Sequence, residues 1–135
     1  MEITNRSDTP ITAQQFVDLL TRSTLGQRRP VDQPDRIQKM LDHGNVLVTA
    51  WHDEKLVGVS RALTDFSYCC YLSDLAVDEV YQHQGIGKQL TYLTHQVAGE
   101  LTMLILLAAP AATTYYPKIG LEKFDHCFVI KRKTV

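Results

Sequence analysis

The segment Asp78–Leu90 reads DEVYQHQGIGKQL and lies between an apolar, strand-like run and a helical pattern. Gly85 and Gly87 therefore stand where a helix should begin, although glycine inside a helix costs roughly 1 kcal/mol relative to alanine. At such a junction several backbone N–H groups are free, and the helix dipole favours an anion such as phosphate. The two glycines predict either a phosphate site or a structural turn that lets the helix pack closely.

Known nucleotide-binding loops do not fit this segment. Gly87 and Lys88 match part of a Walker A loop, but Gln82 stands at its leading glycine and Gln89 at its hydroxyl position. The dinucleotide fingerprint requires a third glycine where Leu90 stands. We therefore expect neither ATP nor NAD at this turn.

The sequence before this segment predicts two helices and three strands. The first helix covers Ala13–Ser23, because Thr12 and Gln15 have the spacing of a capping box. The second begins near Pro34 and stops at Gly44. Short polar links separate the strand candidates, which indicates an antiparallel meander. These candidates are Val46–Trp51, Lys55–Thr64 and Tyr68–Val77.

The sequence after this segment predicts a helix, a buried strand and two shorter elements. The continuous apolar run Met103–Ala108 is typical of a strand covered on both faces, which makes a parallel crossover with the third strand. A short helix should follow over Pro110–Lys118, and the alternation in Cys127–Arg132 predicts a last strand. The long helix should bury one face made of Ile86, Leu90, Leu93, Val97 and Leu101.

The composition favours a single globular domain over residues 1–135, because 44% of the residues are apolar and 21% are charged. A formal net charge of −1 gives no reason to expect nucleic acid as a partner. Three cysteines without disulfide or metal-ligand spacing favour a reducing compartment, and no metal site is predicted. The most apolar window, Leu101–Ala109, is too short to cross a bilayer, so we expect no membrane span and a cytoplasmic protein.

Two neighbouring segments resemble the acetyl-CoA motif of the GNAT family of N-acetyltransferases. Leu75–Val77 is followed by Gln82–Gly87, which fits the family pattern Arg/Gln-x-x-Gly-x-Gly/Ala. The order of the predicted elements also matches that family over nearly the whole chain. The resemblance implies a GNAT-like α+β fold, with a mixed, mostly antiparallel central sheet of six to seven strands flanked by about four helices.

The resemblance also implies a co-substrate, acetyl-CoA. In the GNAT family the backbone N–H groups of this turn hold the CoA pyrophosphate, and the preceding strand holds the pantetheine arm and the acetyl carbonyl. The two glycines, which have no side chain, would then leave space for the pyrophosphate against the backbone. The residues that this assigns to the co-substrate are Leu75, Ala76, Val77, Gln82, His83, Gln84, Gly85, Ile86, Gly87, Lys88, Thr113 and Tyr116.

A second stretch of the family pattern supplies a candidate acid. Residues 114–121 resemble the family segment Phe-Tyr-x-x-x-Gly-Phe, and Tyr116 falls where many members have a tyrosine that protonates the departing CoA thiolate. The alternative is that Tyr116 packs in an amphipathic helix, as we expect for Tyr115. Ala109 stands where the family commonly has an asparagine that contacts the cofactor, so Thr113 is the expected replacement.

The general base and the acceptor site each have more than one candidate interpretation. Asp74, in the strand beside the cofactor, is the first candidate base, and a capped or salt-bridged structural role is its alternative. Glu79 is the second candidate. Arg28 and Arg29, in the loop between the first helices, would bind a carboxylate or phosphate of the acceptor or simply make that loop polar.

The sequence as a whole predicts an acetyl-CoA-dependent N-acetyltransferase. It would move an acetyl group directly, in a ternary complex, to a primary amine of a small molecule or peptide. The alternative is a non-catalytic acyl-CoA-binding sensor or interaction module, and purely structural glycines would mean no CoA binding at all. Edge strands near the C-terminus would allow a homodimer.

Overall fold

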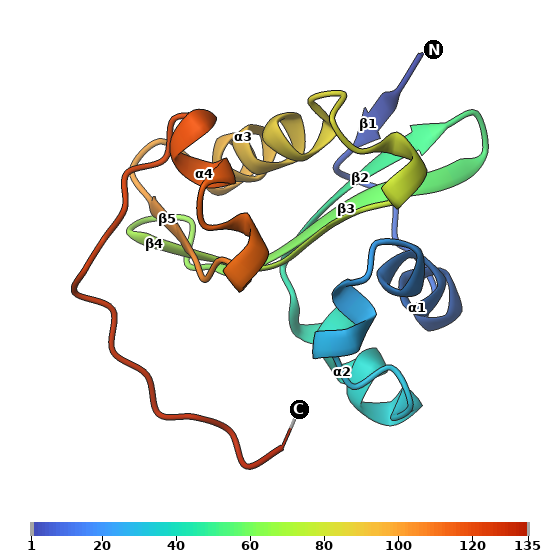
Figure 1. The fold of residues 1–135 in the computed structure, drawn as a ribbon, viewed down its shortest axis with the longest axis horizontal. Coiled ribbons are helices and arrows are strands. Elements are labelled where there is room, and N and C mark those ends of the chain that lie inside the picture. The colour runs from blue at the N-terminus through green and yellow to red at the C-terminus, as the bar shows by residue number, and fades with distance from the viewer. Residues whose placement is uncertain (1, 135) are drawn as a thin grey trace.

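The computed structural model describes residues 2–134 and shows an α+β fold in which one sheet is covered by helices on both faces (Figure 1). The sheet has the strand order β1-β2-β3-β4-β5. The first four strands pair antiparallel, and β5 pairs parallel to β4. Their bounds are Thr4–Arg6, Val46–His52, Lys55–Thr64, Cys69–Val77 and Met103–Leu106. The predicted antiparallel meander and parallel crossover are confirmed.

Two helices, α1 (Ala13–Arg22) and α2 (Pro34–His43), cover one face of the sheet (Figure 1). The predicted capping box starts α1: the Thr12 side chain accepts from the Gln15 N–H, and the Gln15 side chain accepts from the Thr12 N–H. The short 3₁₀ helix η1 (Leu25–Arg28) lies between the two helices. The core on this face is made of Phe16, Leu19, Leu20, Ile37, Trp51, Leu56, Val59 and Ala76.

The opposite face is covered by α3 (Ile86–Ala98), whose buried stripe differs from the predicted one. Ile86 and Leu90 are buried as expected, but Val97 and Leu101 are 41% and 82% exposed. One reason is that α3 ends before Gly99, whose φ of +112° stops the helix. The other is that Thr94 occupies the buried stripe, because its hydroxyl lies 2.6 Å from that of Ser60.

Within residues 2–134 the sheet has five strands, so the prediction of six to seven is wrong. Residues 121–134 form no helix or strand, and Figure 1 shows them running outside the sheet. Cys127–Arg132 was predicted as a strand, but Phe128 is 92% exposed and Ile130 is fully exposed. An alternating sequence indicates which side chains would face each side of a strand, but it does not provide a neighbouring strand for hydrogen bonding. β5 is consequently an edge strand with Ile105 half exposed, and not a strand covered on both faces.

The remaining elements are short. The predicted helix over Pro110–Lys118 consists of the 3₁₀ helix η3 (Pro110–Ala112) and the single-turn α4 (Tyr115–Lys118), and another 3₁₀ helix, η2 (Glu79–Tyr81), follows β4. None of the helices in residues 2–134 has the length and apolar content needed to span a bilayer. Within the same residues, no group of three or more His, Cys, Asp or Glu side chains could hold a metal ion.

The close packing of α3 on the sheet depends on Gly58 in β3. A methyl group at Gly58 would lie 2.9 Å from Leu90 Cδ1 and 3.2 Å from Ile86 Cγ2. Overpacking of this kind lowers the free energy of unfolding by about 1–3 kcal/mol, which we expect for Gly58→Ala in denaturant titrations. In a Leu90→Ala background the closest of these contacts is removed, so the stability loss of the double variant should be smaller than the sum of the two single losses by about 0.5–3 kcal/mol.

The matched control pairs Gly58→Ala with Ile37→Val, which lies in the core on the other face of the sheet. These two changes share no neighbours, so their effects should add within about 0.5 kcal/mol. Full additivity of Gly58→Ala with Leu90→Ala would contradict the packing argument.

Candidate active site

A gap opens between β4 and β5 where their pairing stops. The two strands pair over Cys69–Leu72 with Met103–Leu106, and β4 then continues alone on that side to Val77. The register between β3 and β4 shifts at the same place, which leaves Ser73 without a partner in β3. An extra residue of this kind is a β-bulge, and it bends its strand. The bulge and the end of pairing together separate β4 from β5.

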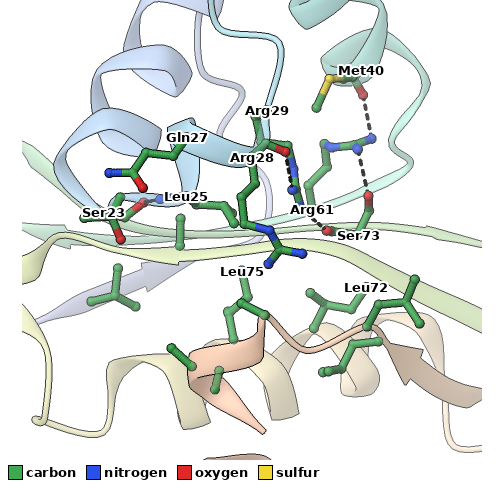
Figure 2. Close-up of a pocket in the computed structure, with 18 of the residues that line it drawn as sticks. Ser23, Leu25, Gln27, Arg28, Arg29, Met40, Arg61, Leu72, Ser73 and Leu75 are labelled. Atoms are coloured by element: carbon green, nitrogen blue, oxygen red, sulfur yellow. Dashed lines mark hydrogen bonds between the residues drawn. The ribbon is translucent and has the colours of Figure 1, made fainter. Parts of the chain in front are cut away.

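A cavity of about 750 Å³ lies at this gap. One wall comes from η1 and α2, another from the end of β4, and a third from η3 and α4 (Figure 2). The residues that line it are Ser23, Thr24, Leu25, Gln27, Arg28, Arg29, Pro30, Arg36, Met40, Arg61, Tyr71, Leu72, Ser73, Leu75, Ala76, Val77, Gln82, Leu106, Leu107, Ala109, Pro110, Ala111, Ala112, Tyr116 and Arg132.

The backbone of β4 is directed into this gap at three alternate residues. The Ser73 carbonyl accepts a hydrogen bond from Arg29 Nη2 at 2.8 Å, and the Val77 carbonyl accepts one from Gln82 Nε2 at 3.0 Å. Backbone groups alternate in direction along a strand, so those of Leu75 point to the same side. Leu75 therefore offers an N–H and a carbonyl to the cavity at a point where β5 no longer pairs with β4.

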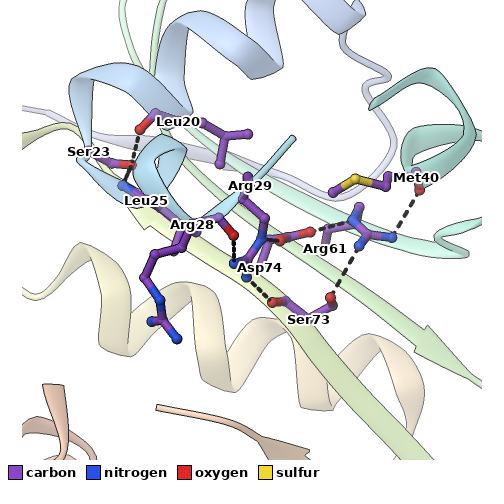
Figure 3. Close-up of polar contacts among 9 residues, drawn as sticks. All are labelled: Leu20, Ser23, Leu25, Arg28, Arg29, Met40, Arg61, Ser73 and Asp74. Atoms are coloured by element: carbon purple, nitrogen blue, oxygen red, sulfur yellow. Dashed lines mark hydrogen bonds and ion pairs between the residues drawn. The ribbon is translucent and has the colours of Figure 1, made fainter. Parts of the chain in front are cut away.

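Asp74 is fully buried and lies between two arginines (Figure 3). Arg29 Nε donates to Asp74 Oδ1, and Arg61 Nε donates to Oδ2 at 2.5 Å. Arg61 also donates to the Met40 carbonyl at 2.9 Å and to the Ser73 hydroxyl at 3.2 Å. Both carboxylate oxygens are therefore used within the fold, and the geometry favours the salt-bridged role of Asp74 over that of base.

A second buried carboxylate, Asp78, fixes the start of the turn after β4. Its Oδ1 accepts the Val80 N–H at 2.9 Å, and its Oδ2 lies 2.5 Å from Arg22 Nη1. Burial acts to raise the pKa of Asp78, but these hydrogen bonds and the charge of Arg22 outweigh it and hold the pKa below its usual value. Arg22 donates as well to the Leu56 carbonyl, so this carboxylate ties α1 and β3 to the turn.

The N-terminus of α3 has free backbone N–H groups. Gly85 precedes the helix with φ +82°, and no side chain caps it. The first N–H groups of a helix have no intrahelical acceptor, so those of Ile86 and Gly87 have none among residues 2–134. His83, in the same turn, also has a positive φ of +65°. Such an arrangement of N–H groups is suited to an anion.

The backbone conformation and the surrounding space differ between the two glycines of this turn. Gly85 is required by its left-handed conformation, because an added methyl group would meet nothing within 4 Å. Gly87 has ordinary helical geometry, and a methyl there would meet only the tip of Tyr115, whose hydroxyl would lie 2.8 Å away. Glycine at position 85 is therefore required by the backbone conformation, whereas a methyl at position 87 fits only if the Tyr115 hydroxyl moves.

Tyr116 lines the cavity and Tyr115 does not. Their rings meet edge to face with centroids 5.1 Å apart. Burial and the neighbouring Tyr115 raise the pKa of Tyr116 above its ordinary value of 10, so its phenol keeps its proton at neutral pH. Burial also raises the pKa of Tyr115, and a hydrogen bond from the Lys88 backbone opposes that rise.

Comparison with known proteins decides the family. Residues 13–121 match the family model described as the acetyltransferase (GNAT) family. The chain belongs to the GNAT family. A GNAT relative in Prochlorococcus marinus, described as an uncharacterized N-acetyltransferase, ycf52-like, is 30% identical over 110 residues. This match covers 77% of the chain, and the chain spans 59% of the length of that relative.

Solved structures share the GNAT fold with this chain. A GNAT family acetyltransferase from Streptococcus pneumoniae has a TM-score of 0.73 at 20% identity, covering 98% of this chain and 100% of that one. An aminoglycoside N-acetyltransferase, AAC(6')-Iy, in complex with CoA has a TM-score of 0.72 at 16% identity, covering 98% and 95%. At these identities the likeness establishes the fold alone.

The GNAT motif residues occupy two places. Within the cavity wall are Leu75, Ala76, Val77, Gln82 and Tyr116. The turn residues from 83 to 88 lie beyond the lining. Ile86 is buried in the core, so only its backbone is available to a ligand. Thr113 is exposed, donates to the Pro110 carbonyl at 3.3 Å and does not line the cavity.

Sequence reasoning missed Arg61 as a part of this cavity. The signal was an arginine in the middle of a strand that is otherwise apolar, Lys55–Thr64. A charge in such a strand needs a buried partner, and Asp74 is the one that the structure supplies.

Asp74→Asn tests which role Asp74 has. Removing the negative partner leaves the charges of Arg29 and Arg61 uncompensated, so we expect the free energy of unfolding to fall by about 3–5 kcal/mol in denaturant titrations. The control Asp125→Asn lies in the exposed C-terminal segment and should change stability by less than about 0.5 kcal/mol. A stable Asp74→Asn variant without acetyl transfer would instead identify Asp74 as the base.

Proposed function

We propose that this protein is an acetyl-CoA-dependent N-acetyltransferase that acts on a primary amine of a small molecule or peptide by direct transfer. One observation carries the proposal: a single cavity contains the strand backbone and the tyrosine expected to act on a thioester, and it also has a separate wall from η1 and α2 for an acceptor. Membership of the GNAT family supports acetyl transfer in general. The CoA complex of a structural neighbour supports the choice of co-substrate.

The residues of the turn and of β4 fit acetyl-CoA, which would supply the acetyl thioester. The N–H groups of Ile86 and Gly87, which have no partner among residues 2–134, would hold the pyrophosphate. A methyl at Gly87 would stand beside these N–H groups, and it would also meet the Tyr115 hydroxyl at 2.8 Å. The backbone N–H of Leu75 would polarise the acetyl carbonyl from the gap beside β5.

Tyr116 is the proposed general acid. When the amine nitrogen bonds to the acetyl carbon and the carbon–sulfur bond breaks, the departing thiolate needs a proton. A phenol whose pKa is raised by burial keeps that proton until it is required. The hydroxyl of Tyr116 would give its proton to the sulfur and regain one from water.

The proton of the acceptor amine would leave through water. Among the described residues that line the cavity there is no Asp, Glu or His. Asp74 lies beneath the wall with both oxygens engaged by arginine, so we assign it to positioning and not to proton removal. Its two partners hold the bulge of β4 in place beside Leu75.

Tyr116→Phe should lower acetyl-CoA-dependent thiol release in the presence of an amine roughly 100-fold or more, because the acid is removed. Tyr68→Phe is the matched control, since Tyr68 is 80% exposed and does not line the cavity. In a pH profile, any loss of wild-type turnover from phenol ionisation should begin at a higher pH than for an ordinary tyrosine, because burial raises the pKa of Tyr116. Normal turnover by folded Tyr116→Phe would contradict the assignment, and CoA binding without any turnover would favour the non-catalytic module.

Gly87→Ala and Gly85→Ala should have different effects. Alanine at Gly87 gains helix propensity but displaces the Tyr115 hydroxyl, so the free energy of unfolding should change by less than about 1 kcal/mol, while calorimetric affinity for acetyl-CoA falls roughly tenfold. Alanine at Gly85 meets a φ of +82°, and it should lower the free energy of unfolding by about 1–2 kcal/mol. Equal acetyl-CoA affinity in wild type and Gly87→Ala would contradict the proposal that the pyrophosphate binds at the N-terminus of α3.

A further inference from the structure

The charges of the cavity wall have one sign. Every ionised side chain in the lining is an arginine, and the described lining residues include no carboxylate. These arginines come from three parts of the chain: η1 and the residue after it, α2 with β3, and the C-terminal segment. The arginines are Arg28, Arg29, Arg36, Arg61 and Arg132.

Three of these five arginines already interact with other groups of the protein. Arg29 and Arg61 share the single negative charge of Asp74, so the three groups together leave one positive charge uncompensated. Arg36 has an interaction of its own. These residues set the potential of the wall, but their donors are largely occupied.

Arg28 differs from them, because its guanidinium has no hydrogen bond or ion pair with any residue from 2 to 134. Its carbonyl accepts from Arg29 Nη1 at 2.9 Å, which fixes the end of η1. Figures 2 and 3 show its side chain directed away from Asp74 and into the cavity, on the side of Leu75. Arg28 is exposed to solvent and also lines the cavity, so its guanidinium is accessible to a ligand in the proposed acceptor half.

We propose that Arg28 binds an anionic group of the acceptor, so that the substrate is a primary amine that also carries a carboxylate or a phosphate. This rests on the proposed acetyl transfer. The planar guanidinium presents paired donors that match either anion, and the excess positive charge of the neighbouring Arg29 and Arg61 strengthens the attraction.

The same charges affect the reacting amine. A positive environment disfavours the ammonium form and favours the neutral, nucleophilic amine. It also opposes polycationic acceptors, which would meet arginine and no carboxylate in the described lining. The arginine wall thus selects for an acceptor with an anionic group and assists the loss of the amine proton through water.

The first experiment measures binding without turnover. Calorimetric titrations with phosphoethanolamine against ethanolamine, and with β-alanine against β-alaninamide, are made on the protein loaded with CoA, which has no acetyl group to transfer. The anionic member of at least one pair should bind roughly tenfold more tightly, and Arg28→Gln should abolish this preference. Lys39→Gln removes the same charge from an exposed position outside the cavity lining and should keep the preference.

The second experiment measures thiol release with acetyl-CoA and the same four amines, with spermidine as a polycation. Wild type should show at least a tenfold higher kcat/KM for the anionic member of the preferred pair than for its neutral analogue or spermidine. In Arg28→Gln this ratio should approach one, whereas Lys39→Gln should keep the wild-type ratio.

The outcomes separate this inference from the proposed function. If neither anion binds better than its neutral analogue, or if Arg28→Gln binds the anions as tightly as wild type, the inference is overturned whatever the turnover. Higher turnover with spermidine than with both anionic amines overturns it as well. Anion binding that depends on Arg28, without acetylation of any amine, supports the anion site and refutes acetyl transfer.

Discussion

A buried carboxylate with two arginine partners holds the site together. Asp74 would be costly to bury alone, and its ion pairs with Arg29 and Arg61 make its burial possible. The same guanidinium groups donate to the bulge residue Ser73 and to the end of α2. The position of η1, the shape of β4 and the floor of the acceptor wall therefore depend on one charge cluster.

The cavity follows from a local irregularity in an otherwise regular sheet. β4 has one residue more than β3 at Ser73, and β5 stops pairing at the adjacent residue, Leu72. Without the bulge, the two parallel strands would have no reason to separate at that point. The separation leaves backbone groups of Leu75 unpaired by β5, and polar backbone without a partner is suited to hold an extended ligand. The proposed reaction thus takes place where the regular hydrogen bonding of the sheet is interrupted.

The parts of the site that are proposed to have different roles also differ in charge. Burial and the neighbouring Tyr115 raise the pKa of the tyrosine that is proposed as acid, whereas the wall made by η1 and α2 carries arginine. The proposed phosphate bed lies apart from both, at the N-terminus of α3, and depends on backbone groups and not on side chains. Three different physical devices therefore serve the three parts of one proposed reaction.

Much of the fold was predictable because local signals agreed with it. The capping box at Thr12, the glycine after α2 and the alternating strands all act within a few residues, and each is confirmed. The predicted last strand was wrong because alternation carries no information about a partner. The stripe on α3 was partly wrong because Thr94 is buried through a hydroxyl contact with Ser60, a residue 34 positions away.

The sequence by itself determined the order of the elements, the glycine turn and the tyrosine motif, since spacing along the chain encodes them. Only the tertiary structure decided that Asp74 lies between Arg29 and Arg61, that Gly87 lies against the Tyr115 hydroxyl, and that Arg28 lines a cavity. These facts depend on contacts between residues tens of positions apart. The partner of a charge depends on how the chain brings distant segments together, and no local pattern records it.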